Sequence, residues 1–224
     1  MSAPSFTRSP GVPETKQSLD ERLSRPLPAL ITVGVLLLVM VVLEIVDAAI
    51  PANLDLYGIE AQEPDGLPGI FSAPFLHHGF AHLWSNAVPF FVLGFLTIIG
   101  GMKRFVLASI GIIIISGLFA WGLTFGPGTQ IIVGASGWVF GLLTYLLARG
   151  VFTRNGKQIV ISVVVLALYG SVLLGIFPTE AGVSWQGHLG GAVAGVLMAW
   201  LLSRGDRARR ASSSVTKTSP GPTL

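Results

Sequence analysis

The sequence contains no cysteine among its 224 residues. This absence excludes disulfides, thiolate metal sites and cysteine nucleophiles. Charged residues are also scarce: they form 11% of the chain, against about a quarter in an ordinary soluble domain. The first 28 residues lack a short apolar core followed by a small-residue cleavage site, so we do not expect a removable signal peptide.

Apolar residues form 51% of the chain and are concentrated in long runs. A helix needs about 20 mostly apolar residues to cross a bilayer. Six runs approach this length: 29–50, 82–99, 105–124, 134–149, 158–177 and 185–203. We therefore predict an all-α, polytopic membrane protein with six transmembrane helices. Basic residues lie between the runs, so the expected partner is the lipid bilayer and not nucleic acid.

The polar segments outside the runs complete the predicted organisation. Residues 28–204 form the six-helix domain, in which residues 51–81 are too polar and too rich in Pro and Gly to span and form a structured interfacial loop. Residues 1–27 are predicted to be a disordered N-terminal tail. Residues 205–224, which are basic and rich in Ser, Thr and Pro, are predicted to be a disordered C-terminal tail.

The distribution of Lys and Arg predicts the orientation of the chain. Basic residues precede the first run, follow the second and the fourth, and follow the sixth. The loops on the opposite side carry Asp and Glu but no Lys or Arg. Cytoplasmic loops collect Lys and Arg. We therefore expect an even number of spans with both termini in the cytoplasm. The compactness of the chain and its lack of organelle signals favour a bacterial plasma membrane, and the sequence leaves the oligomeric state open.

Polar residues interrupt the second, fourth and sixth runs near their outer ends. They are His82 and Asn86, Ser136, and His188. At about 1.5 Å rise per residue, all four lie within roughly 10 Å of the outer helix ends. Stripes of glycine on the fourth and sixth runs (Gly137 and Gly141; Gly187, Gly191 and Gly195) would let these two helices approach closely. Taken alone, such stripes favour ordinary tight packing over a catalytic role.

These residue types suggest acyl-transfer chemistry. A neutral imidazole at His188 beside the Ser136 hydroxyl is the minimum pair of general base and nucleophile. No acidic residue occurs in the last three runs, so such an enzyme would use a dyad. His82 and Asn86 share a helix face and could, with the Ser136 backbone N–H, stabilise an oxyanion.

Two other interpretations of the polar residues remain open. A structural hydrogen-bond cluster could cap the second helix and hold the loop, and His77 and His78 fit that role better than a catalytic one. The four histidines at 77, 78, 82 and 188 could also bind zinc, but no carboxylate or regular spacing completes a ligand shell. We therefore expect neither a metal nor a cofactor.

Three motifs resemble those of rhomboid proteases. They are HGFAHLWSN at 78–86, GASGWVFGLL at 134–143 and GHLGGAVAG at 187–195, and they occur in the family's order. The resemblance implies a six-helix rhomboid bundle and an intramembrane serine endopeptidase that cleaves transmembrane segments of other membrane proteins near the outer face, without a cofactor.

The resemblance also implies roles for individual residues. Ser136 corresponds to the nucleophile and His188 to the general base, while His82, Asn86 and the Ser136 amide correspond to the oxyanion hole. Three further residues would shape the site: Gly134 in the loop before the nucleophile, Gly137 directly after it, and Phe140, which matches an aromatic ring packed on the catalytic imidazole.

The sequence departs from the family pattern at two places. The interfacial loop lacks the Trp-Arg pair of many members, and the third helix begins without the acidic residue often found there. Two alternative functions also remain: a catalytically silent rhomboid-like protein that binds transmembrane clients, and a small-solute transporter or channel. A transporter would favour polar residues at the midplane and an internal repeat, neither of which the sequence presents.

Overall fold

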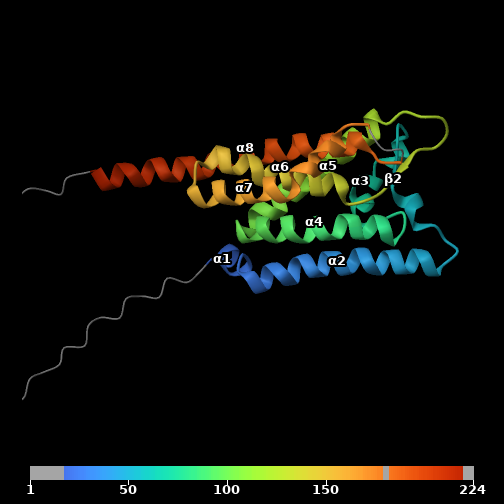
Figure 1. Cartoon of the computed structure of the whole chain (residues 1–224), viewed down its shortest axis with the longest axis horizontal. Helices are drawn as coiled ribbons and strands as arrows, with labels where there is room; N and C mark the ends of the chain where they lie inside the picture. Colours follow the sequence, from blue (N-terminus) through green and yellow to red (C-terminus); the bar gives the residue numbers. More distant parts are fainter. Residues whose placement is uncertain (1–17, 179–181, 219–224) are drawn as a thin grey trace, which may run out of the picture.

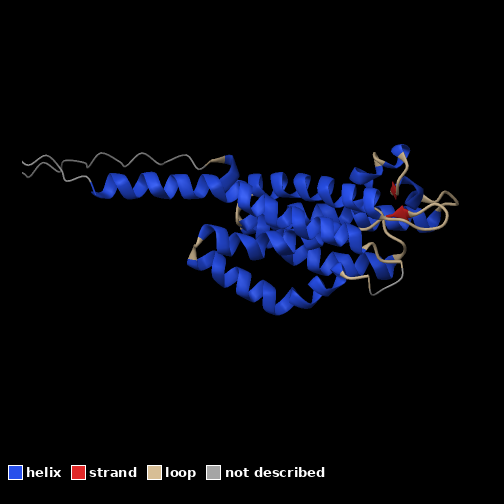
Figure 2. Cartoon of the chain, turned by 90° about the horizontal axis from the view of Figure 1, so that it is seen from above, coloured by secondary structure: helices blue, strands red, loops and turns tan. Residues whose placement is uncertain are grey.

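The computed structural model describes residues 18–178 and 182–218, the segment 205–218 by its backbone alone. Within this part of the chain, long helices bundle side by side, and the short elements other than α1 gather at one end (Figure 1). Figure 2 shows the same bundle turned by a quarter. The long helices are α2 (Pro26–Ala49), α4 (Phe80–Ile99), α5 (Met102–Leu123), α6 (Ser136–Thr153), α7 (Gly156–Tyr169) and α8 (Trp185–Thr218).

The prediction of an all-α membrane bundle is confirmed. A long helix occupies each of the six predicted ranges, although α7 is completed by the 3₁₀ helix η4 (Gly170–Ile176). Four segments are long and apolar enough to cross a membrane: α2, α4, α5 and the α7–η4 segment. That the other two, α6 and α8, also span remains a prediction.

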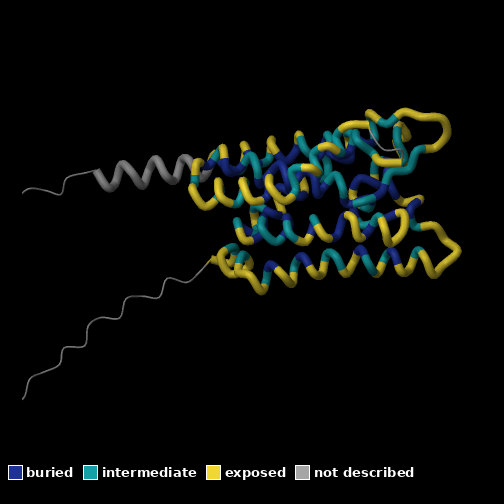
Figure 3. The backbone as a smooth tube through the Cα atoms, in the orientation of Figure 1, coloured by how far each residue is buried: buried dark blue, intermediate teal, exposed yellow. Residues whose placement is uncertain are grey.

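Helix α6 lies at the centre of the bundle, where most of its residues are buried (Figure 3). It packs most closely against α8. A Cβ added at Gly191 would overlap the Gly137 carbonyl, and one added at Gly195 would overlap the Gly141 carbonyl. The Thr144 hydroxyl donates a hydrogen bond across the contact to the carbonyl of Ala192, at 2.9 Å. The glycine stripes therefore bring the two helices together at backbone distance.

The segment between α2 and α4 is a structured loop at one end of the bundle. It contains η1 (Leu54–Tyr57), β1 (Ile59–Glu60), η2 (Pro64–Gly66), α3 (Gly69–Ser72) and η3 (Ala73–Phe75). Strand β1 pairs in antiparallel register with β2 (Ile131–Ile132), which precedes α6, so that Ile59 lies opposite Ile132. The loop is thereby joined to the segment that leads to Ser136.

A second set of contacts holds this loop against the end of α5. Gln62, at φ 68°, donates from its side-chain Nε2 to the carbonyl oxygens of Gly122 at 2.8 Å and Trp121 at 3.1 Å. The indole N–H of Trp121 donates in return to the Glu63 carbonyl, at 2.7 Å. These bonds satisfy carbonyls at the C-terminus of α5 that have no partner within the helix. They tie the loop to the end of α5.

Both predicted tails contain helix. Within 1–27, residues Leu19–Leu23 form α1, which begins with a capping box between Ser18 and Glu21. Asp20 and Ser24 then accept hydrogen bonds from the first two backbone N–H groups of α5. Helix α8 continues to Thr218, beyond the predicted end at residue 203. Residues 204–211 are rich in Arg and Ala, which favour helix, and the sequence has no proline between Pro178 and Pro220. Residues 1–17 and 219–224 lie outside the described part of the chain.

Candidate active site

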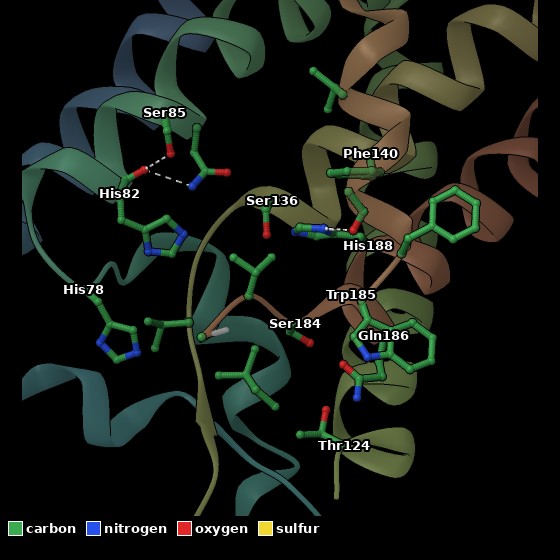
Figure 4. Close-up of a pocket in the computed structure, with 18 of the residues that line it drawn as sticks. His78, His82, Ser85, Thr124, Ser136, Phe140, Ser184, Trp185, Gln186 and His188 are labelled. Carbon is green, nitrogen blue, oxygen red and sulfur yellow. Dashed lines mark hydrogen bonds between the residues drawn. The ribbon is translucent and has the colours of Figure 1, made fainter. Parts of the chain in front are cut away.

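A cavity of about 930 Å³ opens at the end of the bundle where the loop lies. Residues from α4, β2, α6, η4 and the start of α8 line it. The predicted site residues His82, Asn86, Ser136, Phe140 and His188 all contribute to its wall. Figure 4 shows Ser136 between the His82 side of the cavity and the His188 side. Four residues predicted to meet from three separate helices therefore share one cavity.

Ser136 is the first residue of α6. Its backbone N–H therefore belongs to the first turn, whose N–H groups have no acceptor within the helix and mark the positive end of the helix dipole. The preceding loop is held by two backbone hydrogen bonds: Gly134 N–H donates to the Ala73 carbonyl at 2.8 Å, and Ala135 N–H donates to Nε2 of His77 at 3.4 Å. The entry to α6 is thus attached to the interfacial loop.

Gly134 adopts a backbone conformation that other residues rarely take. Its φ is +117°, and an added Cβ would lie 2.7 Å from Cε1 of His82. The chain therefore passes directly over the His82 ring before it turns into α6. Gly137 is also confined, because a Cβ there would lie 2.9 Å from the Ser116 hydroxyl and 3.2 Å from the Gly187 carbonyl.

His188 lies in the first turn of α8, and two contacts hold its ring. The Phe140 ring stacks on it with a centroid distance of 4.1 Å and an interplanar angle of 10°. Its Nδ1 lies 2.8 Å from the Gly175 carbonyl oxygen. A carbonyl can only accept, so Nδ1 carries the hydrogen and, in the neutral ring, Nε2 keeps its lone pair. This is the tautomer in which Nε2 can take a proton.

His82 and Asn86 occupy the first two turns of α4. The Asn86 side-chain nitrogen donates to the His82 carbonyl at 3.0 Å, which accounts for one of its two hydrogens and fixes the amide plane. The His82 ring meets the edge of the His77 ring at a centroid distance of 5.2 Å. Both side chains are therefore held by neighbours at the wall of the cavity. Figure 4 shows His82 on the side of the cavity opposite His188.

His77 and His78 lie in the loop just before α4 and make different contacts. His77 is buried, and burial together with the nearby His82 ring lowers its pKa to about 4. Its ring is therefore neutral at pH 7. His78 is half exposed and its Nδ1 lies 2.7 Å from the Asp55 carboxylate. Across the described ranges, no three His, Asp or Glu side chains are arranged to hold a metal ion.

The structure adds residues to the cavity that sequence reasoning did not identify. Gly175 contributes a carbonyl, a group that every residue carries, so no sequence signal could have revealed it. Ser184 also lines the cavity, and its hydroxyl accepts from the Gly187 N–H at 3.2 Å. A serine directly before a glycine-rich helix is a recognisable capping signal and could have been found.

Comparison with known proteins supplies the family of the chain. Residues 65–205 match the family model of the Rhomboid domain. An uncharacterized protein of Mycobacterium tuberculosis is 41% identical over 227 residues, which cover 98% of this chain and 94% of the relative. An uncharacterized protein of Mycobacterium leprae is 40% identical over 198 residues, or 85% of this chain and 78% of the relative. A protein of Acanthamoeba polyphaga mimivirus named as a candidate rhomboid protein is 32% identical over 126 residues, or 54% of this chain and 67% of the relative.

Proposed function

The chain belongs to the rhomboid family of membrane proteins, and on that premise we propose that it is an intramembrane serine endopeptidase. Its substrates are transmembrane segments of other membrane proteins. The observation that carries the proposal is the tautomer of His188 in the cavity that also holds Ser136. Its Nδ1–H donates to the Gly175 carbonyl, so Nε2 is the nitrogen that can accept the proton of Ser136. No cofactor takes part in this reaction.

The proposed reaction has two halves. His188 Nε2 takes the Ser136 hydroxyl proton as Oγ attacks the scissile carbonyl carbon, and His188 then gives that proton to the leaving amine. The resulting acyl-enzyme is hydrolysed by water, with His188 again acting as the base. A cavity of about 930 Å³ is large enough to hold both water and an extended peptide segment.

In the proposed oxyanion hole, three donors face the oxygen that becomes negative during attack. They are the His82 ring, the second amide hydrogen of Asn86 and the Ser136 backbone N–H. Support comes from their shared cavity and from the position of Ser136 at the positive end of α6. Gly134, Gly137 and Phe140 shape this arrangement by close packing.

The proposed orientation places the cavity at the outer face of a bacterial plasma membrane and both termini in the cytoplasm. Support comes from the Lys and Arg residues in α1, at the start of α5 and around the α6–α7 turn, because these parts form the end of the bundle far from the cavity (Figure 1). A substrate helix must unwind before attack, because its carbonyls are hydrogen-bonded within the helix. We expect helix-breaking residues near the scissile bond.

The proposal is tested by cleavage of a single-span reporter in liposomes that contain the purified protein. The compared proteins are the wild type, Ser136→Ala, His188→Ala and a control, Ser171→Ala, which also lies at the cavity wall. Wild type and control should cut near the outer boundary, while the two dyad variants should be folded and inactive. Cleavage by either dyad variant at the wild-type rate would contradict the proposal.

A fluorophosphonate probe decides the case in which the reporter is not cut. Labelling of the wild type and the control but not of Ser136→Ala would show an activated serine and a poorly chosen reporter. Absence of labelling in all variants would favour the catalytically silent alternative, in which the cavity binds transmembrane clients without cutting them.

A further inference from the structure

Helix α7 ends in the 3₁₀ segment η4, and this segment approaches the base. Gly175 is the sixth of its seven residues, and its carbonyl oxygen lies 2.8 Å from Nδ1 of His188. Residues 136–178 and 185–204 contain no Asp or Glu. The acceptor for the Nδ1–H of His188 is therefore a main-chain carbonyl. In serine enzymes with a triad, a carboxylate accepts this hydrogen bond.

The hydrogen bond and the ring stack constrain different motions of the imidazole. Stacking on Phe140 holds the plane of the ring, but a ring can still turn within that plane. The bond from Nδ1–H to the carbonyl stops that rotation and selects the tautomer. Once Nε2 has taken a proton, the carbonyl dipole also faces the charged imidazolium, and bonds to charged groups are the stronger ones.

The glycine at position 175 is required by this approach. An added Cβ would lie 2.9 Å from Cζ of Phe140 and 3.3 Å from Nδ1 of His188. Any side chain would thus push against the stacked pair. By contrast, a Cβ at Gly170, in the same segment, would approach only the flexible end of Leu166, at 3.2 Å.

We propose that the main-chain carbonyl of Gly175 is the third member of the catalytic group, a positioning group that orients His188. This proposal rests on the proposed protease function. Among the described residues, η4 has none that is buried. The orientation of the base therefore depends on where the α7–η4 segment sits against α8, and outward displacement of η4 would release the imidazole.

The tautomer of His188 is the first test, and it needs no substrate. The chain has four histidines, so ¹⁵N-histidine NMR in liposomes gives a small set of signals, and a His188→Asn variant assigns those of His188. We expect His188 to carry its hydrogen on Nδ1. A predominant Nε2–H tautomer in the wild type would overturn the proposal.

A variant at Glu180 tests whether a carboxylate, and not the Gly175 carbonyl, orients the His188 ring. Glu180 is the only acidic residue between η4 and α8 in the sequence and lies outside the described residues. In Glu180→Gln, the Nδ1–H tautomer should persist. If this variant alone abolishes it, the carboxylate is the orienting group and the proposal fails.

A backbone exchange tests the carbonyl itself without adding a side chain. Replacing Ile176 by its α-hydroxy analogue turns the Gly175–Ile176 amide into an ester, whose carbonyl is a weaker acceptor. We expect kcat to fall about 10-fold while KM stays within about twofold. The matched control is the same exchange at Leu173, which is also in η4 but does not line the cavity, and it should leave kcat close to wild type. Equal kcat values for the two esters would overturn the proposal.

Side-chain variants give the same comparison in a simpler form. Gly175→Ala should lower kcat about 10- to 100-fold and broaden or shift the His188 signals, whereas Gly170→Ala should change neither. If Gly175→Ala fails to fold, the ester comparison decides. Failure of reporter cleavage by the wild type would count against the protease function alone, because the NMR result is independent of turnover.

Discussion

The three histidines between positions 77 and 82 have distinct environments although they are close in sequence. His77 is buried under the loop that leads to Ser136, His78 pairs with Asp55, and His82 lies at the cavity wall. Residue type alone could not separate them. Their different partners assign His77 to support of the nucleophile loop, His78 to the interfacial loop and His82 to the proposed oxyanion hole.

The depressed pKa of His77 predicts a pH dependence of stability. The folded-state pKa is about 4, whereas an unfolded histidine titrates near 6.5. Between these values the unfolded state binds the proton more readily. The free energy of unfolding should therefore fall as the pH drops from 6.5 to 4, by about 3 kcal/mol, and this group should have no effect above pH 6.5.

Unfolding measured in detergent between pH 7 and pH 4 checks this prediction. His77→Gln, which can still accept the Ala135 N–H, should have a flatter pH profile than the wild type. His78→Gln is the control, since it removes a half-exposed ring and leaves His77 buried. A wild-type slope in His77→Gln would refute the assignment.

The backbone at Gly134 predicts a second residue-scale effect. Gly134→Ala combines a strained φ of +117° with a Cβ placed 2.7 Å from the His82 ring. We expect a loss of stability of about 1–3 kcal/mol and loss of reporter cleavage. Gly128→Ala is the matched control, because its φ is +72° but nothing lies within 4 Å of the new Cβ. It should be strained yet active.

At the scale of elements, the contact between α6 and α8 determines whether Ser136 and His188 can meet. These helices are the two that did not qualify as spans by length and apolar composition. Helix α6 is largely buried among other helices, and α8 packs one face against it while Val193 and Leu201 stay exposed. Protein neighbours tolerate small and polar residues that lipid would not. Backbone proximity along the glycine stripes then fixes the relative depth of the two catalytic candidates.

Enlarging a glycine in this contact should separate the helices. A Cβ in Gly195→Ala would overlap the Gly141 carbonyl and the Thr144 hydroxyl. We expect a loss of about 1–3 kcal/mol of stability, measured by thermal unfolding, and reduced cleavage. Gly34→Ala on α2 has open space around its Cβ and should be neutral or slightly stabilising. Equal stability of both variants would argue against the close contact.

For the whole molecule, the ends of the described chain and the basic loops lie at one end of the bundle, and the cavity lies at the other (Figure 1). This arrangement agrees with an even number of membrane crossings. In the proposed orientation the basic residues face the cytoplasm. The polar residues of α4, α6 and α8 line the cavity at the opposite end.

The absence of cysteine allows a direct test of this orientation. Leu56→Cys introduces an exposed thiol in η1, and Gly156→Cys introduces one at the start of α7, where nothing lies within 4 Å. In intact bacterial cells, a membrane-impermeant maleimide should label the first and not the second. After the membrane is permeabilised, both should be labelled. The reverse pattern would invert the proposed topology.

The sequence by itself determined the membrane class, the ranges of the long helices and the residues that share one cavity. These follow from local properties, because hydropathy over about 20 residues reflects the bilayer, and polar groups within apolar runs are conspicuous. The sequence did not determine the helical parts of the tails, because composition alone could not show that Asp20 and Ser24 cap α5.

Only the tertiary structure decided how the site is supported. His77 meets the Ala135 N–H from 58 positions away, and Gln62 reaches the end of α5 across a similar separation. The group that we propose orients His188 is the main-chain carbonyl of Gly175, and no residue type in the sequence identifies it. Such contacts depend on main-chain atoms brought together by folding, which no pattern of residue types encodes.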